Sequence, residues 1–159
     1  MSRVLVIADV PWVRNEVHAA LTGSDLVLID HADPETVNEA VISNRADIVV
    51  SDMQVASMGG MAIVRRVRSA AGMDGMSIPV VLLLDRTADV FLARRAAATG
   101  WVQKPFSSRE LETTVRAALK GDPFPVPDRF LDGEDATTVP ASQLGTAVTV
   151  DDGDAEPAT

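Results

Sequence analysis

The sequence contains no cysteine and few aromatic residues. Of its 159 residues, none is cysteine and 4% are aromatic. The absence of cysteine excludes disulfides and thiolate metal sites. The two tryptophans, Trp12 and Trp101, are too few to form a platform on which nucleic-acid bases stack. No G-x-G-x-x-G pattern follows the first apolar run, which argues against a dinucleotide-binding turn.

The chain also lacks a long hydrophobic run and a basic region. No apolar stretch approaches the length of a membrane span, and no signal-peptide pattern follows Met1, so we expect a cytoplasmic protein with no membrane partner. The net charge is -9, and residues 120–159 hold nine acids against Lys120 and Arg129, a net -7. Because nucleic-acid binding requires a basic face, we expect no nucleic-acid partner.

Apolar runs that look like buried strands alternate with helical patterns. The runs are rich in Val, Ile and Leu and mostly lack polar alternation, as expected for strands covered on both faces. Strands are predicted at 3–8, 25–30, 47–51, 79–84 and 100–103. Helices are predicted at about 11–21, 33–43, 60–70, 88–98 and 107–121.

Five successive strand–helix units with short connections predict an α/β fold. The expected architecture is a doubly wound, five-stranded parallel sheet with helices on both faces. Asp33-Pro34 and the capping box from Ser107 to Glu110 mark two of the helix starts. Beyond Lys120, closely spaced prolines interrupt the helical pattern. We therefore expect one domain at 1–121 and an acidic, disordered tail at 122–159.

Three polar residues lie where predicted strands end. Asp9 follows the first strand, Asp52 follows the third, and Lys104 follows the fifth, just before Pro105. Ligands gather at the carboxyl ends of the strands in an open parallel sheet, so we expect the two acids and the amine to share a pocket. Each acid could instead be a helix cap or a solvated loop residue, and for Asp9 alone that explanation is the better one, but the three residues together favour a chemical role.

These residues, on these elements, resemble the receiver domain of bacterial two-component response regulators. The resemblance covers about residues 2–120 and rests on Asp9, Asp52, Met58, Gly60 and the run Lys104-Pro105-Phe106. It implies a flavodoxin-like sheet of strand order 2-1-3-4-5. It also implies a protein that is not an enzyme and that accepts a phosphoryl group on Asp52 from a sensor histidine kinase or phosphotransfer protein.

The resemblance further implies a magnesium site and a role for each reactive group. The metal ligands would be Asp9, Asp52 and the backbone carbonyl of Gln54. A bound Mg²⁺ offsets the repulsion between these carboxylates and an anionic phosphodonor. Lys104 would contact the phosphoryl oxygens, and the peptide between Lys104 and Pro105 would be cis.

The sequence departs from the family pattern close to this pocket. Ala8 replaces the first of two adjacent acids, and Ala56 replaces a usual proline in the loop after Asp52. Leu84 holds the switch position of a Thr or Ser that hydrogen-bonds the phosphoryl group in the family. Trp101 holds the switch position of an aromatic residue that follows this hydroxyl inward, although simple packing explains Trp101 equally well.

Two functional hypotheses remain. The first is a stand-alone response regulator that acts through a downstream protein bound to the face of the fourth helix, fifth strand and fifth helix. The second is a phosphorylation-independent pseudo-receiver, an interaction module that keeps only the fold. Ala8 and Leu84 favour the second hypothesis. The retention of Asp9, Asp52 and Lys104 favours the first, which we adopt.

Overall fold

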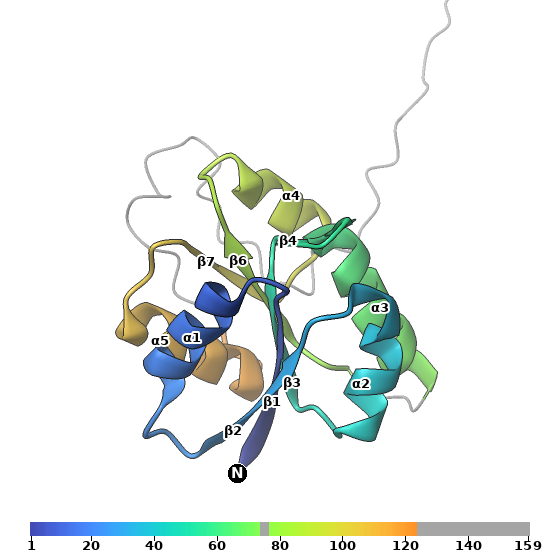
Figure 1. Cartoon of the computed structure of the whole chain (residues 1–159), viewed down its shortest axis with the longest axis horizontal. Coiled ribbons are helices and arrows are strands. Elements are labelled where there is room, and N and C mark those ends of the chain that lie inside the picture. The colour runs from blue at the N-terminus through green and yellow to red at the C-terminus, as the bar shows by residue number, and fades with distance from the viewer. Residues whose placement is uncertain (74–76, 124–159) are drawn as a thin grey trace, which may run out of the picture.

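A five-stranded parallel sheet forms the centre of the molecule. The computed structural model describes residues 1–73 and 77–123. The sheet strands are β1 (Ser2–Ile7), β2 (Leu26–His31), β3 (Ile48–Asp52), β6 (Val80–Leu84) and β7 (Gly100–Gln103). They lie in the order β2-β1-β3-β6-β7 (Figure 1). The predicted strand order is therefore confirmed.

Helices cover both faces of the sheet, as predicted. Helices α1 (Pro11–Leu21) and α5 (Ser108–Lys120) pack together on one face (Figure 1). The other face carries α2 (Val37–Ser43), α3 (Gly60–Met73) and α4 (Asp89–Arg95). None of the helices within the two described ranges is both long and apolar enough to cross a lipid bilayer.

The helix ends agree with the predicted caps, and α3 runs three residues past its predicted end at 70; two further ends differ. The capping box between Ser107 and Glu110 is present at the start of α5. Asp33 caps a short 3₁₀ turn, η1 (Pro34–Thr36), so the helix predicted from 33 begins as a tighter turn. Helix α4 ends three residues before its predicted end at 98, because Ala97 adopts a left-handed φ of 55°.

The predicted boundary at residue 121 falls at a helix end. Gly121 has a φ of 73° and follows the last residue of α5, a common way for a helix to terminate. The division into a domain at 1–121 and a tail at 122–159 stays a prediction. From residue 124 onward the predicted tail lies outside the described residues.

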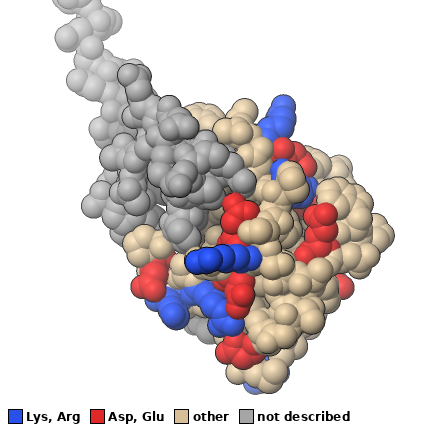
Figure 2. Space-filling model, turned by 90° about the vertical axis from the view of Figure 1, so that its left-hand side faces the viewer, with Lys and Arg blue, Asp and Glu red and all other residues tan. Residues whose placement is uncertain are grey.

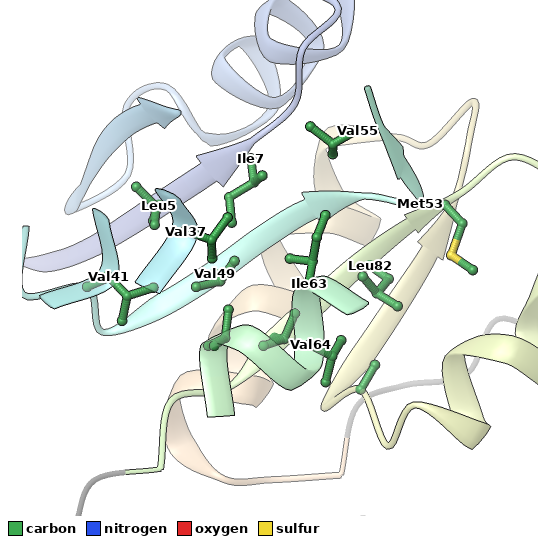
Figure 3. Close-up of a cluster of buried hydrophobic side chains, with 14 of the residues drawn as sticks. Leu5, Ile7, Val37, Val41, Val49, Met53, Val55, Ile63, Val64 and Leu82 are labelled. Carbon is green, nitrogen blue, oxygen red and sulfur yellow. The ribbon is translucent and has the colours of Figure 1, made fainter. Parts of the chain in front are cut away.

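Alternate side chains of the sheet strands enter two apolar clusters. In β1, Leu5 and Ile7 point to the side of α2 and α3, and Val4 and Val6 point to the side of α1 and α5. Figure 3 shows the first cluster, which includes Leu82 of β6. Because both faces are buried, both sets of side chains are apolar, and this explains the absence of polar alternation in the sequence.

A small hairpin that the sequence did not predict follows β3. It consists of β4 (Gln54–Val55) and β5 (Met58–Gly59), which pair antiparallel. Gly60 begins α3 directly after it, and the Gly60 N–H donates to the Met53 carbonyl at 2.8 Å. The hairpin therefore connects the end of β3 to α3 at the edge of the sheet where the polar residues were predicted to meet.

Gly60 packs tightly against two neighbouring side chains, which would have to shift to admit a larger residue. A Cβ there would approach the Met53 sulfur to 3.1 Å and a Leu82 methyl to 3.2 Å. We expect Gly60→Ala to lower the free energy of unfolding by about 1 kcal/mol, measured by chemical denaturation. The matched control is Gly72→Ala in the same helix, where a Cβ meets no atom within 4 Å. It should raise stability by about 0.5 kcal/mol, and an equal effect of the two changes would contradict the packing argument.

Candidate functional site

Asp52 is a buried carboxylate at the carboxyl end of the central strand. It is the last residue of β3 and is 4% exposed. Its Oδ1 accepts hydrogen bonds from the Met53 N–H at 2.8 Å and from the Lys104 ammonium at 2.8 Å. Both donors reach the same oxygen, which leaves Oδ2 as the atom available for reaction.

Lys104 brings its ammonium into the same pocket from β7. Its N–H donates to the Leu84 carbonyl at 2.8 Å, which extends the pairing of β6 and β7 by one residue. The peptide that joins it to Pro105 is cis, as the resemblance implied. The Nζ lies 2.8 Å from Asp52 and 2.9 Å from Asp85, and the side chain is 9% exposed. The predicted meeting of Asp52 and Lys104 is therefore present.

The carboxylates of Asp52 and Asp85 keep the Lys104 side chain protonated. Burial lowers the pKa of the Lys104 ammonium, but hydrogen bonds and negative charges from Asp52 and Asp85 outweigh that effect and hold the pKa above its usual 10.5. Trp12 adds a third contact, because its ring centroid lies 5.5 Å from the Lys104 Nζ. Lys104 thus remains a cation across the neutral pH range.

Asp9 lies two residues beyond the end of β1, the neighbour of β3, at the same edge of the sheet as Asp52. It is exposed, and its Oδ2 accepts a hydrogen bond from the Ala56 N–H at 3.0 Å. Ala56 has a φ of 51°, and the Gln54 side-chain amide donates to its carbonyl at 3.0 Å. Proline lacks an N–H and is fixed near a φ of about −65°. The Asp9 contact therefore explains why alanine and not proline occupies position 56.

The missing second acid leaves an apolar position beside Asp9. Ala8 is completely buried, and its carbonyl accepts from the Arg14 guanidinium at 2.6 Å. Within 1–73 and 77–123, no three His, Asp or Glu side chains are grouped to hold a metal ion. Mg²⁺ commonly binds through one or two carboxylates and keeps several waters, so Asp9 and Asp52 fit that chemistry. The Gln54 carbonyl stays a predicted ligand.

The two predicted switch positions both lie inside the protein. Leu84 is fully buried in the cluster on the α4 side of the sheet. Trp101 is 4% exposed, and the Arg94 guanidinium lies 5.7 Å from its ring centroid. The nearest hydroxyl along the chain belongs to Thr87, which donates to the Gln103 side chain at 3.3 Å. Thr87 therefore does not take the place of a hydroxyl at position 84.

Sequence reasoning missed Asp85, the second acid on Lys104. Asp85 directly follows the last residue of β6, at the same edge of the sheet where Asp52 ends β3. The strand-end signal that singled out Asp9 and Asp52 was present here too.

Residues 4–116 match the family model of the response regulator receiver domain. The chain belongs to this family. Receiver domains are regulatory parts of two-component systems and are phosphorylated by histidine kinases. The family typically binds Mg²⁺ in its active site.

Named relatives agree with this membership. The chain is 28% identical over 144 residues to the DNA-binding response regulator MtrA of Mycolicibacterium smegmatis, covering 89% of this chain and 61% of MtrA. The chain therefore spans about three fifths of that regulator.

Solved receivers share the fold. The chemotaxis response regulator CheY4 of Vibrio cholerae has a TM-score of 0.63 and 25% identity, covering 74% of this chain and 98% of CheY4. The receiver domain of the sensor histidine kinase PA1611 of Pseudomonas aeruginosa, described with magnesium coordinated in its active site cleft, has a TM-score of 0.66 and 18% identity, with 75% and 98% covered.

Proposed function

We propose that this receiver accepts a phosphoryl group on Asp52 from a phosphohistidine in a sensor kinase or phosphotransfer protein. The observation that carries the proposal is the 2.8 Å contact between the Asp52 carboxylate and the Lys104 ammonium, both nearly buried. A buried pair costs desolvation, so its presence at a strand end supports a retained chemical role.

The reaction uses the geometry of these two side chains. Asp52 Oδ2 attacks the phosphorus, a new O–P bond forms, and the P–N bond to the donor imidazole breaks. The bonding electrons go to the imidazole nitrogen, which is then protonated by solvent. Lys104 is within reach of the phosphoryl oxygens and stabilises their charge as they transfer. Loss of the group to water would later restore the carboxylate.

We assign a magnesium site to Asp9, Asp52 and the Gln54 carbonyl. When bound, Mg²⁺ would neutralise charge on the carboxylates and on the phosphoryl oxygens. The Asp9 contact with Ala56 supports this assignment, because it holds the hairpin next to β1. The magnesium described in the PA1611 receiver makes the same chemistry reasonable here.

We propose a protein partner on the face formed by α4, β7 and α5. Phe91 on α4 is 64% exposed and offers an apolar side chain to a docking protein. Figure 2 shows the side of the molecule on which Figure 1 places α1 and α5, and acidic and basic side chains intermingle there. That mixture gives no support to nucleic acid as the partner on the face shown. The stand-alone arrangement stays a prediction.

A pseudo-receiver is the second candidate, favoured by specific observations. Ala8 offers no carboxylate to a metal, and Leu84 offers no hydroxyl to a phosphoryl group. Such a module would bind its partner whether or not Asp52 is modified. The two candidates differ in one measurable property, the ability of Asp52 to accept phosphorus.

The test is phosphodonor labelling read by mass spectrometry of the intact protein. With acetyl phosphate and Mg²⁺, we expect one phosphoryl group to be added, and Asp52→Asn should abolish the addition. Asp47→Asn is the matched control, since Asp47 is an acid outside the pocket that accepts from the Arg3 N–H at 2.7 Å. It should label like the unmodified chain. If millimolar donor adds nothing to the unmodified chain, the pseudo-receiver is the correct function.

A further inference from the structure

Asp85 and Asp52 both form ion pairs with the Lys104 ammonium. The Asp85 Oδ1 lies 2.9 Å from the Lys104 Nζ, opposite the 2.8 Å contact that Lys104 makes with Asp52. The side chains of the two acids differ in their exposure to solvent. The Asp52 side chain is 6% exposed at the end of a central strand, whereas the Asp85 side chain is 55% exposed at the start of a loop.

Phosphorylation would turn this sharing into competition. Transfer to Asp52 replaces one carboxylate charge by a phosphoryl group of roughly two negative charges, with three strong acceptor oxygens. Lys104 would then bind the phosphoryl oxygens, and Asp85 would face a dianion at close range. The residues that would hold a metal, Asp9 and Asp52, follow β1 and end β3, whereas Asp85 follows β6 on the other side of β3. Asp85, the more exposed acid, is the group that can move into water.

The loop that begins at Asp85 is firmly joined to α4. The Arg86 N–H donates to Asp89 Oδ2 at 3.0 Å, and the Arg86 guanidinium contacts Asp89 Oδ1 at 3.0 Å. Asp89 is the first residue of α4 and is 4% exposed. A displacement of Asp85 is therefore carried by the next residue to a buried anchor at the start of α4.

The same loop lines a cleft beside the pocket. Asp85, Arg86 and Asp89 line an open space of about 390 Å³ together with Met53 and Gly60. Movement of the loop would change the shape of this cleft and the position of α4. The cleft adjoins the element on which the exposed Phe91 lies.

We propose that Asp85 is the switch residue of this receiver: the phosphoryl group on Asp52 draws Lys104 away from Asp85, and the released acid shifts the β6–α4 loop. This mechanism rests on phosphorylation of Asp52. The charge of Asp85 would take the role of the hydroxyl that position 84 lacks. Phosphorylation is thereby read out through the loss of an ion pair.

The test compares backbone amide spectra before and after labelling with acetyl phosphate and Mg²⁺. In the unmodified chain, the amides of Arg86, Thr87 and Asp89 should shift on phosphorylation. In Asp85→Asn, which removes the charge but keeps the shape, these amides should already lie near the phosphorylated positions. Labelling of Asp85→Asn should then shift these amides several-fold less than labelling of the unmodified chain does. Asp85→Glu, which keeps the charge, should restore most of the shift.

The matched control is Asp30→Asn on β2. Asp30 is a half-exposed acid that pairs with His18 at 2.8 Å, away from the pocket. Its variant should show the full shift in the loop amides. Asp85→Asn should also label several-fold faster than Asp30→Asn or the unmodified chain, because Lys104 then has one carboxylate partner fewer and contacts the donor more readily.

The outcomes separate the two proposals. If mass spectrometry finds no phosphoryl group on the unmodified chain, the proposed function fails, and the switch fails with it. If labelling is complete and Asp85→Asn retains the full amide shift, the function stands and the switch is wrong. The spectrum of unlabelled Asp85→Asn gives a second check, since loop amides identical to those of the unmodified chain also overturn the switch. Should Asp85→Asn fold poorly, Asp85→Ser serves the same comparison.

Discussion

Replacing Lys104 by methionine is expected to slow phosphorylation of Asp52 by about 100-fold. Methionine keeps an unbranched apolar side chain of similar length but has no charge. The transferring phosphoryl oxygens would lose the cation that lies 2.8 Å from the acceptor carboxylate. The rate is measured by mass spectrometry over time with acetyl phosphate and Mg²⁺.

The same change should also lower the free energy of unfolding by about 3 kcal/mol, because it leaves a buried carboxylate without its cation. The Asp52 side chain is only 6% exposed, so water does little to replace the lost partner. Chemical denaturation followed by circular dichroism measures this loss. Circular dichroism is preferred to fluorescence because Trp12 contacts Lys104 directly.

The chain offers a matched control for both effects. Its other lysine, Lys120, is exposed at the end of α5. Lys120→Met should leave the labelling rate and the stability nearly unchanged. The double variant Lys104→Met with Asp52→Asn should regain much of the lost stability, since neither charge then remains unpaired. A labelling rate for Lys104→Met within a few-fold of the unmodified chain would show that Lys104 does not stabilise the transfer.

The fold was predictable because its sheet is buried on both faces. Runs such as Val4 to Ile7 are apolar on either side, and this pattern has few explanations other than a covered parallel strand. The pairing of Asp52 with Lys104 followed from topology, because the carboxyl ends of parallel strands meet at one edge. These inferences need only the order of elements and the period of the side chains.

Contacts that depend on backbone angles were not predictable in the same way. Ala56 adopts a φ of 51° in its turn, and because positive φ angles are usually found at glycine, an alanine gives no indication of it in the sequence. The ion pair of Asp85 and the ring of Trp12 over Lys104 depend on where a loop and a helix start direct their side chains. Sequence position placed Asp85 at a strand end, but only coordinates show which partner it meets.

Replacing Leu84 by threonine is expected to destabilise the unphosphorylated protein by about 3 kcal/mol. Leu84 is completely buried in the apolar cluster that also contains Trp101. Threonine fills less of this space and brings a hydroxyl into it. Leu84→Val is the matched control, because valine has the shape of threonine without the hydroxyl. Leu84→Val should lower the free energy of unfolding by about 1 kcal/mol, and the difference between the two variants measures the cost of burying the hydroxyl.

Phosphorylation should reverse part of the threonine penalty. Leu84 ends the strand next to Asp52, and a hydroxyl there would gain the phosphoryl oxygens as acceptors. A hydrogen bond to a charged group contributes about 2 kcal/mol, so labelling should raise the thermal stability of Leu84→Thr well above its effect on Leu84→Val. The amides near Trp101 should then shift more on labelling than in the unmodified chain. Unchanged amide shifts there would contradict the expected gain in coupling.

The threonine also tests how the signal leaves the pocket. In the unmodified chain, position 84 has no hydroxyl and Asp85 follows it directly. The shift of the β6–α4 loop should therefore depend on Asp85. With Leu84→Thr, a second connection exists that needs no ion pair. Adding Leu84→Thr to Asp85→Asn should therefore restore a phosphorylation-dependent shift in the loop amides, whereas Leu84→Val in the same background should not. Equal spectra for the two double variants would mean that a hydroxyl at position 84 cannot reach the phosphoryl group in this pocket.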